Sequence, residues 1–187
     1  MYDVLIDRID HQGRGIGYID GKIIFVKNAL PGERVNVNIV YENKKFYEGV
    51  VLEYYNKSDN RVDVLCPYYD SCGGCDVMHM NYDFQHDYKI NKVKDIIRKF
   101  VKENIDVVDM SYGNQFNYRN KATFHVKEGI GYFKEKTYDL IPIDKCMISS
   151  NEINVDSTSS FKNNYIITFG SVIMIIGLGT IITVNKK

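Results

Sequence analysis

The first 55 residues contain short segments of alternating or β-branched residues, separated by Gly, Pro and Asn. The segments read DVLIDRI, KIIFV, RVNVNIV and YEGVVLEY. This pattern is typical of short strands joined by tight turns. An open sheet of so few strands would leave its edges unpaired, so closure is favoured. We therefore predict that residues 1–55 form a small barrel of the OB type.

One helix and a few strands are predicted in residues 56–153. In YDFQHDYKINKVKDIIRKFVKEN the apolar residues recur at helical spacing and the opposite face is rich in lysine, which indicates either a solvated face or one that also meets phosphate. The later stretch YRNKATFHVKEGIGYFKEKTYDLIPI reads as two or three strands with glycine-containing turns. The predicted fold class is mainly β with one helix: the OB-like barrel, followed by an α+β partial domain.

The character of the sequence changes at residue 154. NVDSTSSFKNN is polar and linker-like, and the stretch from Tyr165 to Val184 carries no charge. At about 1.5 Å per residue a helix of this length just spans a hydrocarbon core. Residues 154–187 are therefore predicted to be a linker and an apolar segment. Three alternatives stay open for that segment: an out-of-frame tail, a membrane helix, or a buried β-hairpin.

The overall charge gives no general attraction to nucleic acid. The chain has 24 Lys and Arg against 24 Asp and Glu, so any surface for RNA must come from local clustering. The N-terminal stretch MYDVLIDRIDHQGRG lacks the basic-then-apolar pattern of a secretory signal. We expect a cytoplasmic protein, with a single C-terminal membrane anchor as the alternative. In a reducing cytoplasm, clustered cysteines are ligands or reactive groups more often than disulfides.

Three of the four cysteines lie within CPYYDSCGGC, as Cys66, Cys72 and Cys75, and the fourth is Cys146. Four thiolates can complete either a tetrahedral zinc site or an iron–sulfur cube. Structural zinc sites usually use two close pairs, whereas only one close pair is present here. The glycines between Cys72 and Cys75 allow the main chain to approach cluster sulfurs. The spacing favours a 4Fe–4S cluster, with zinc and free redox thiols as alternatives.

Several motifs together resemble one family. GRGIGYIDGKIIFVKNALPGERVNVNIV, then CPYYDSCGGCDVMHMNYDFQHDYK, then YRNKATFHV and the late Cys146 resemble the N-terminal part of the bacterial RNA (uracil-C5) methyltransferases, which make 5-methyluridine in ribosomal or transfer RNA. The resemblance covers about residues 1–153. It implies an RNA-binding TRAM barrel, a 4Fe–4S cluster on Cys66, Cys72, Cys75 and Cys146, and S-adenosylmethionine as the cofactor of the full-length enzyme.

The catalytic part of this family has no counterpart in the sequence. The resemblance implies a cysteine that attacks C6 of uracil and a base that later removes the C5 proton. The sequence has four cysteines, and the cluster would use all of them. A catalytic α/β domain of about 150 to 200 residues does not fit after Cys146. We expect a truncated N-terminal portion that is inactive alone; the alternative is a free-standing, membrane-tethered RNA-binding or electron-transfer protein.

A few basic residues are candidate RNA contacts. They lie in a glycine-rich turn, at the tip of an expected hairpin and in an expected strand with aromatic neighbours. The same residues would serve equally as turn decoration or as solubilising groups. The candidates are Arg14, Lys44, Lys45, Arg119 and Lys121.

Overall fold

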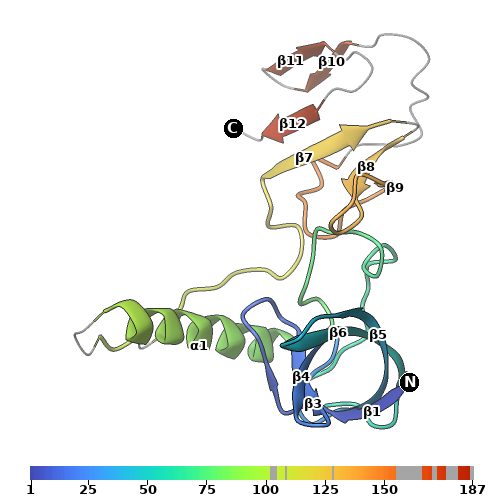
Figure 1. Cartoon of the computed structure of the whole chain (residues 1–187). Helices are drawn as coiled ribbons and strands as arrows, with labels where there is room; N and C mark the ends of the chain where they lie inside the picture. The colour runs from blue at the N-terminus through green and yellow to red at the C-terminus, as the bar shows by residue number, and fades with distance from the viewer. Residues whose placement is uncertain are drawn as a thin grey trace. The chain divides into compact units, whose positions relative to one another are not determined.

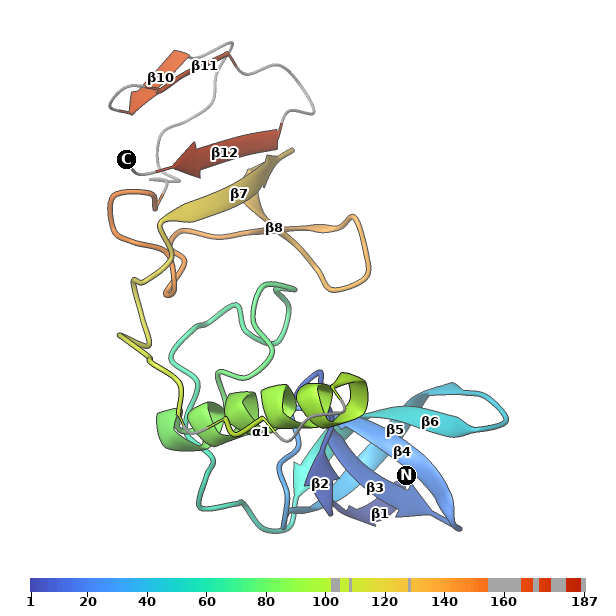
Figure 2. The ribbon, with the colours of Figure 1, turned by 90° about the vertical axis from the view of Figure 1, so that its left-hand side faces the viewer.

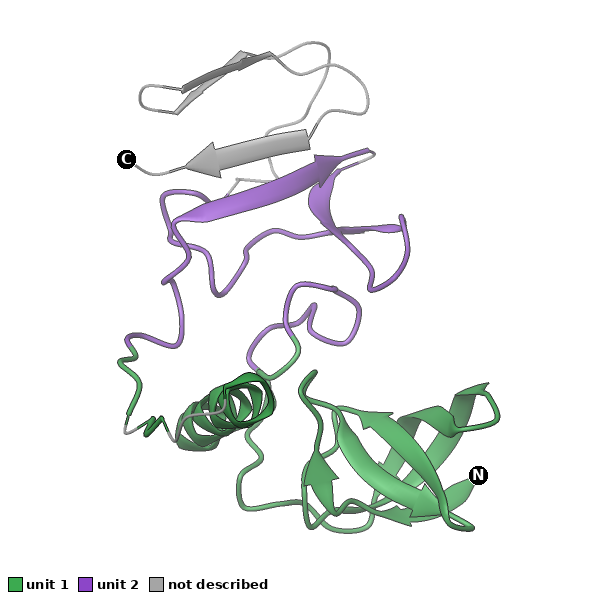
Figure 3. Ribbon diagram, turned by 60° about the vertical axis from the view of Figure 1, so that its left-hand side comes forward, with its two compact units in different colours: residues 1–64, 76–112 green, residues 65–75, 113–187 purple. Residues whose placement is uncertain are grey.

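The computed structural model describes most of the chain. Its described residues are 1–101, 105–107, 109–127, 129–154 and, for the backbone alone, 166–169, 172–175 and 181–185. The chain divides into two compact units, which Figure 3 shows in different colours. Unit 1 comprises Met1–Val64 and Asp76–Tyr112, and unit 2 comprises Leu65–Cys75 and Gly113–Lys187.

Unit 1 is built on a curled six-stranded sheet, whose strands form a ring in Figure 1. The strand order is β1-β5-β6-β4-β3-β2, antiparallel except for the parallel pair β4–β6. The strands are β1 (Tyr2–Leu5), β2 (Arg8–Ile9), β3 (Gly15–Ile19), β4 (Lys22–Lys27), β5 (Arg34–Glu42) and β6 (Phe46–Tyr54). The mainly β, OB-like fold predicted from the sequence is confirmed.

The interior of the barrel is filled by aliphatic side chains from alternate strand positions. Burial of each such side chain contributes about 1.5–3 kcal/mol. Two glycines allow the strands to approach closely: a Cβ on Gly49 would lie 2.3 Å from Cγ1 of Val37, and one on Gly17 would lie 2.4 Å from Cγ1 of Val4. The buried cluster consists of Val4, Ile6, Ile19, Ile24, Val26, Ala29, Val35 and Val37.

A buried ion pair fastens the chain after β6 to the barrel. Glu33 is fully buried, and its Oε2 accepts from Nη2 of Arg61 at 2.7 Å and from the N–H of Leu30 at 2.8 Å. The N–H of Ser58 donates to the other carboxylate oxygen at 3.1 Å. Burial by itself would raise the pKa of Glu33, but these hydrogen bonds and the Arg61 charge outweigh it and lower the pKa below 4.5.

The predicted helix is α1 (Tyr82–Phe100), which belongs to unit 1. It begins after Asn81, whose side chain accepts from the N–H of Phe84 at 2.8 Å and caps the first turn. Arg98 and Lys99 lie in the last turn, where positive charge suits the helix dipole. The sequence prediction extended this helix to residue 104, but the helix ends at Phe100 and residues 102–104 lie outside the described part.

Unit 2 contains a four-stranded antiparallel sheet with the order β12-β7-β8-β9. The strands are β7 (Lys121–Val126), β8 (Ile130–Phe133), β9 (Leu140–Pro142) and β12 (Ile181–Asn185). The first three are the strands predicted from YRNKATFHV onward. Their buried cluster is small and consists of Ala122, Phe124, Ile130, Ile143 and Ile153, with Tyr68 and Cys146 packed against it.

The apolar segment from Tyr165 to Val184 is β-structure wherever the structure describes it. β10 (Ile166–Phe169) and β11 (Val172–Ile175) pair antiparallel, and β12 pairs with β7. The described backbone over these residues is strand and not helix, and β10 with β11 forms a hairpin. Of the helices in the described residues, none has the length and apolar character needed to cross a membrane. The linker over residues 155–164 lies outside the described residues.

Candidate functional site

All four cysteines belong to unit 2, and two sets of contacts connect the loops that carry them. The N–H of Gly73 donates to the carbonyl of Phe133 at 3.1 Å, so the loop with Cys72 lies along the end of β8. The hydroxyl of Tyr68 donates to Asp144 at 2.9 Å, which joins the same loop to the segment before Cys146. The four thiols are half-buried and form no disulfide. The structure thus connects the loops that carry cysteines distant in sequence.

The thiols influence one another electrostatically. Burial, followed by the charges of the other three cysteines, raises the pKa of Cys75 to about 11. Burial is also the main reason that the pKa of Cys72 is raised; a hydrogen bond from the Gly74 backbone and the guanidinium of Arg119 oppose it. Four thiolates placed here would therefore repel one another unless a cation or cluster compensated their charge.

Buried hydroxyl groups lie beside Cys146. The hydroxyls of Tyr132, Ser149 and Ser150 are buried and have no hydrogen-bond partner of good geometry among the described residues. Burial and the nearby charge of Cys146 raise the pKa of Tyr132 to about 12. Buried hydroxyls without partners are rare because each loses its hydrogen bonds to water. They are suitable donors to thiolate or sulfide sulfur atoms.

Backbone access to the thiols depends on glycine. A Cβ on Gly74 would lie 3.3 Å from Sγ of Cys72, and one on Gly73 would lie 3.1 Å from the carbonyl oxygen of Phe133. Across the described residues, no three His, Cys, Asp or Glu side chains are gathered closely enough to hold a metal ion. The four cysteines therefore supply thiols of the type that bind zinc or an iron–sulfur cluster, but in this structure they are not gathered into a metal-binding set.

Arg14, a candidate RNA contact, is held by carboxylates. Its Nε donates to Asp10 at 2.8 Å and its Nη1 to Glu48 at 2.9 Å. The guanidinium also lies 4.3 Å from the ring centre of Phe25. Its positive charge is therefore balanced within the barrel, and its role there is at least partly structural.

Lys44 and Lys45 are exposed at the turn between β5 and β6. The turn is organised by Asn43, whose side-chain oxygen accepts from the N–H of Lys45 at 2.8 Å and of Phe46 at 2.9 Å. Within the described residues neither lysine takes part in an ion pair. Both are therefore available to a phosphate.

Arg119 and Lys121 lie in unit 2 and not with the other candidate cations. The N–H of Arg119 donates to the carbonyl of Ile148 at 2.8 Å, and its guanidinium acts on Cys72 and Cys75. Lys121 is exposed at the start of β7. The five predicted RNA contacts thus fall into two groups, one on each unit.

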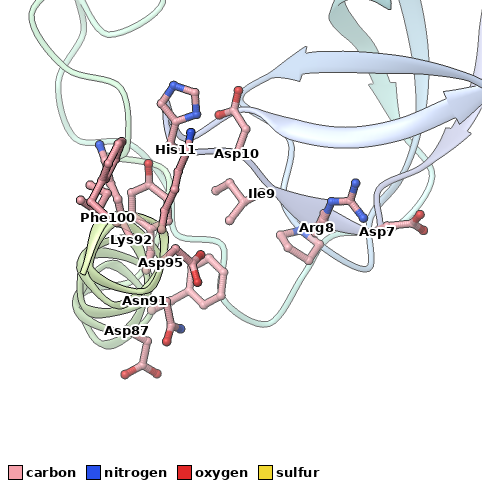
Figure 4. A pocket seen from close by; sticks show the side chains of 15 residues that line it. Asp7, Arg8, Ile9, Asp10, His11, Asp87, Asn91, Lys92, Asp95 and Phe100 are labelled. Atoms are coloured by element: carbon pink, nitrogen blue, oxygen red, sulfur yellow. The ribbon is translucent and has the colours of Figure 1, made fainter. Parts of the chain in front are cut away.

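Sequence reasoning did not find the pocket of unit 1 that lies between residues 7–11, with Pro31, and α1. Figure 4 shows the side chains that line this pocket, which include His11, Arg8, Lys92 and Asp95. Its volume is about 670 Å³. Basic and acidic groups alternate around it, so its charge favours neither an anion nor a cation. The amphipathic pattern of the helix was the available signal for one wall of this pocket.

Comparison with known proteins relates the chain to RNA-modifying enzymes. Residues 1–52 match the family model of the TRAM domain. An uncharacterized RNA methyltransferase of Caldanaerobacter subterraneus subsp. tengcongensis is 40% identical over 153 residues, which cover 79% of this chain and 34% of that protein. The 23S rRNA (uracil(1939)-C(5))-methyltransferase of Vibrio parahaemolyticus is 34% identical over 159 residues, covering 81% of this chain and 36% of that protein.

A solved structure gives the same relationship. The tRNA (uracil-54, C5)-methyltransferase of Pyrococcus abyssi, in complex with S-adenosyl-L-homocysteine, matches with a TM-score of 0.56 and 28% sequence identity. The match covers 79% of this chain and 33% of that one. The chain spans about a third of the length of the curated relatives that it matches. The chain therefore belongs to the RNA (uracil-C5) methyltransferase family, and it corresponds to the N-terminal, TRAM-containing part of these proteins.

Proposed function

We propose that this chain is the RNA-binding, cluster-bearing N-terminal portion of an S-adenosylmethionine-dependent RNA uracil-C5 methyltransferase that modifies ribosomal or transfer RNA in the cytoplasm. The observation that carries the proposal is the similarity over 153 residues to an RNA methyltransferase, in a chain whose first 52 residues match the TRAM domain. The related enzymes named for 23S rRNA and for tRNA support both classes of RNA.

The proposed cluster is a 4Fe–4S cube on Cys66, Cys72, Cys75 and Cys146. The connected loops, the glycine approaches and the buried hydroxyls near Cys146 support it. A zinc ion would require all four sulfurs at about 2.3 Å from one point, whereas a cube with four irons accepts thiolates that are farther apart. When bound, the cluster would cross-link the Cys66–Cys75 loop to the segment around Cys146.

The proposed role of this chain in methyl transfer is to bind and orient RNA. Attack on C6 of uracil needs a free thiol, and the sequence has four cysteines, all of them proposed cluster ligands. We therefore propose that the chain by itself is inactive and that S-adenosylmethionine belongs to the full-length enzyme.

RNA binding by the full chain, purified without oxygen, tests this proposal. The affinity for a ribosomal RNA stem-loop should fall as salt is raised, because binding displaces counterions from phosphates. Replacing Lys44 and Lys45 by alanine should reduce the salt dependence, whereas Lys57→Ala is a matched surface control outside that turn. Absence of RNA binding would contradict the proposed function. Transfer of labelled methyl from S-adenosylmethionine to RNA by this chain would contradict the assignment of all four cysteines to the cluster.

A further inference from the structure

The outer surface of the barrel carries aromatic side chains on four neighbouring strands. The strand registers place them in two adjacent rows: Tyr18 pairs with Ile23 and Ile23 with Phe46, while Phe25 pairs with Glu48 and Glu48 with Tyr41. The alternate residues of these strands, such as Ile24 and Val26, belong to the buried cluster. We call Tyr18, Phe25, Tyr41 and Phe46 the aromatic face.

Three rings of the aromatic face contact one another. Phe25 and Phe46 meet edge to face with their ring centres 5.4 Å apart, and Tyr41 lies 5.9 Å from Phe46. Tyr41 is 50% exposed and Tyr18 is 43% exposed, so these rings are not part of the core. Rings that are fixed by one another and open to solvent provide flat surfaces without loss of side-chain freedom on binding.

The positively charged side chains near the aromatic face differ in whether they are available to bind a phosphate. The guanidinium of Arg14 packs on Phe25 and is balanced by Asp10 and Glu48. Two carboxylates thus neutralise the Arg14 charge, so this part of the face offers no free positive charge to a phosphate and suits uncharged bases better. Lys44 and Lys45 stand at the turn between Tyr41 and Phe46, on the β5–β6 hairpin that projects from the barrel in Figure 2.

We infer that the aromatic face binds unpaired bases of RNA by stacking on Tyr41, Phe46 and Tyr18, with Lys44 and Lys45 contacting the neighbouring phosphates. This inference rests on the proposed RNA-binding function and names the part of RNA that the barrel recognises. Bases within a duplex are stacked on one another, whereas unpaired bases offer their faces to aromatic side chains. The selected RNA is therefore single-stranded.

The test measures binding of the full chain to a fluorescently labelled single-stranded oligouridylate and to an RNA duplex of equal length. Tyr41→Ala should weaken binding of the single strand about tenfold at both low and high salt, because a stacking contact is lost and no phosphate contact changes. Tyr41→Phe keeps the ring and should restore most of the affinity. Tyr55→Ala removes an equally exposed tyrosine after β6 and should leave binding unchanged.

Two results would overturn the inference. The first is that the unmodified chain binds RNA but Tyr41→Ala loses no more affinity than Tyr55→Ala. This result would leave the proposed function intact and would assign the aromatic face to a protein partner. The other is an equal loss for single-stranded and duplex RNA. If the unmodified chain binds no RNA, both the inference and the proposed function fail. Circular dichroism and thermal unfolding of each variant distinguish loss of a contact from loss of folding.

Discussion

The two units of this chain are stabilised by different means. In unit 1 eight buried aliphatic and alanine side chains fill the barrel, and a buried glutamate is fully hydrogen-bonded. In unit 2 five buried residues form the core, and three buried hydroxyls lack a hydrogen bond of good geometry among the described residues. Burial of apolar surface is sufficient to stabilise unit 1. Unit 2 leaves buried hydroxyls and thiols without strong interactions, and a bound cluster would provide hydrogen-bond acceptors for the first and ligation for the second. The difference indicates which unit depends on the proposed cluster.

The largest expected effect is on the barrel, from Arg61→Ala. This change leaves the Glu33 carboxylate buried without its partner and should lower the free energy of unfolding of unit 1 by about 3–5 kcal/mol. Arg34→Ala is the matched control, because Arg34 and its partner Asp3 are exposed and an exposed ion pair contributes little to stability. Urea unfolding followed by hydrogen exchange of the β4 and β5 amides measures both. Equal effects of the two changes would show that the buried pair does not fasten the chain to the barrel.

Acid should destabilise unit 1 through His79, which is buried. Burial, and then the Arg61 charge, lowers the pKa of His79 to about 4 from 6.5. The unfolded chain binds a proton between these two values and the folded chain does not, so stability falls by up to about 3 kcal/mol as the pH drops through this interval. Below the ordinary pKa of Glu33 a further loss follows, because the pKa of Glu33 is lowered by folding.

His79→Gln should remove the first part of this acid dependence. Unfolding of unit 1 is measured at several pH values between about 7 and about 4, the range in which histidine titrates, for the variant and for the unmodified chain. A profile with the same slope in the variant and in the unmodified chain would exclude His79 as its origin.

The close packing of the barrel can be tested at Gly49. A Cβ at this position would lie 2.3 Å from Val37, so Gly49→Ala should destabilise unit 1 by about 1–3 kcal/mol. Gly113→Ala is the control, because a Cβ there meets nothing within 4 Å. Thermal unfolding monitored by circular dichroism compares the two. A neutral Gly49→Ala would mean that the strands of the barrel can separate without loss of stability.

The smallest expected change in stability is for Tyr132→Phe in unit 2. Removing a buried hydroxyl whose contacts with Ser149 and Cys146 lack good hydrogen-bond geometry should alter the stability of the cluster-free chain by less than about 1 kcal/mol. In the cluster-bearing chain the same change should lower the reduction potential, because hydrogen bonds to cluster sulfurs favour the reduced state. An unchanged potential would exclude this hydroxyl as a donor to the cluster.

The sequence was sufficient to predict the secondary-structure elements, because local residue patterns determine them. The strands of the barrel, α1 and β7 to β9 follow from residue periodicity and turn residues. The parallel pairing of β4 with β6 could not be predicted, because it is set by closure of the whole sheet. KIIFV has no polar alternation, so it does not show that Phe25 faces outward.

The roles of the charged candidates depended on contacts distant in sequence. Asp10, four residues before Arg14, was a local signal for a partner, but Glu48 was not predictable. Arg119 was predicted as an RNA contact from its aromatic neighbours, and the structure places its charge near Cys72 and Cys75. The four cysteines were predicted to be the ligands of one cluster; contacts with β8 and Asp144 connect their loops, and the shared site stays a prediction.

The most direct test of the cluster assignment is hydrogen exchange on the chain purified without oxygen, before and after removal of iron by a chelator. We expect bound iron and sulfide, and at least about tenfold faster exchange in the Cys66–Cys75 loop and in β7 and β8 after removal. Exchange in β1 to β6 should stay unchanged, because the barrel has its own core. A chain that binds stoichiometric zinc and no iron, or that exchanges identically in both states, would contradict the account.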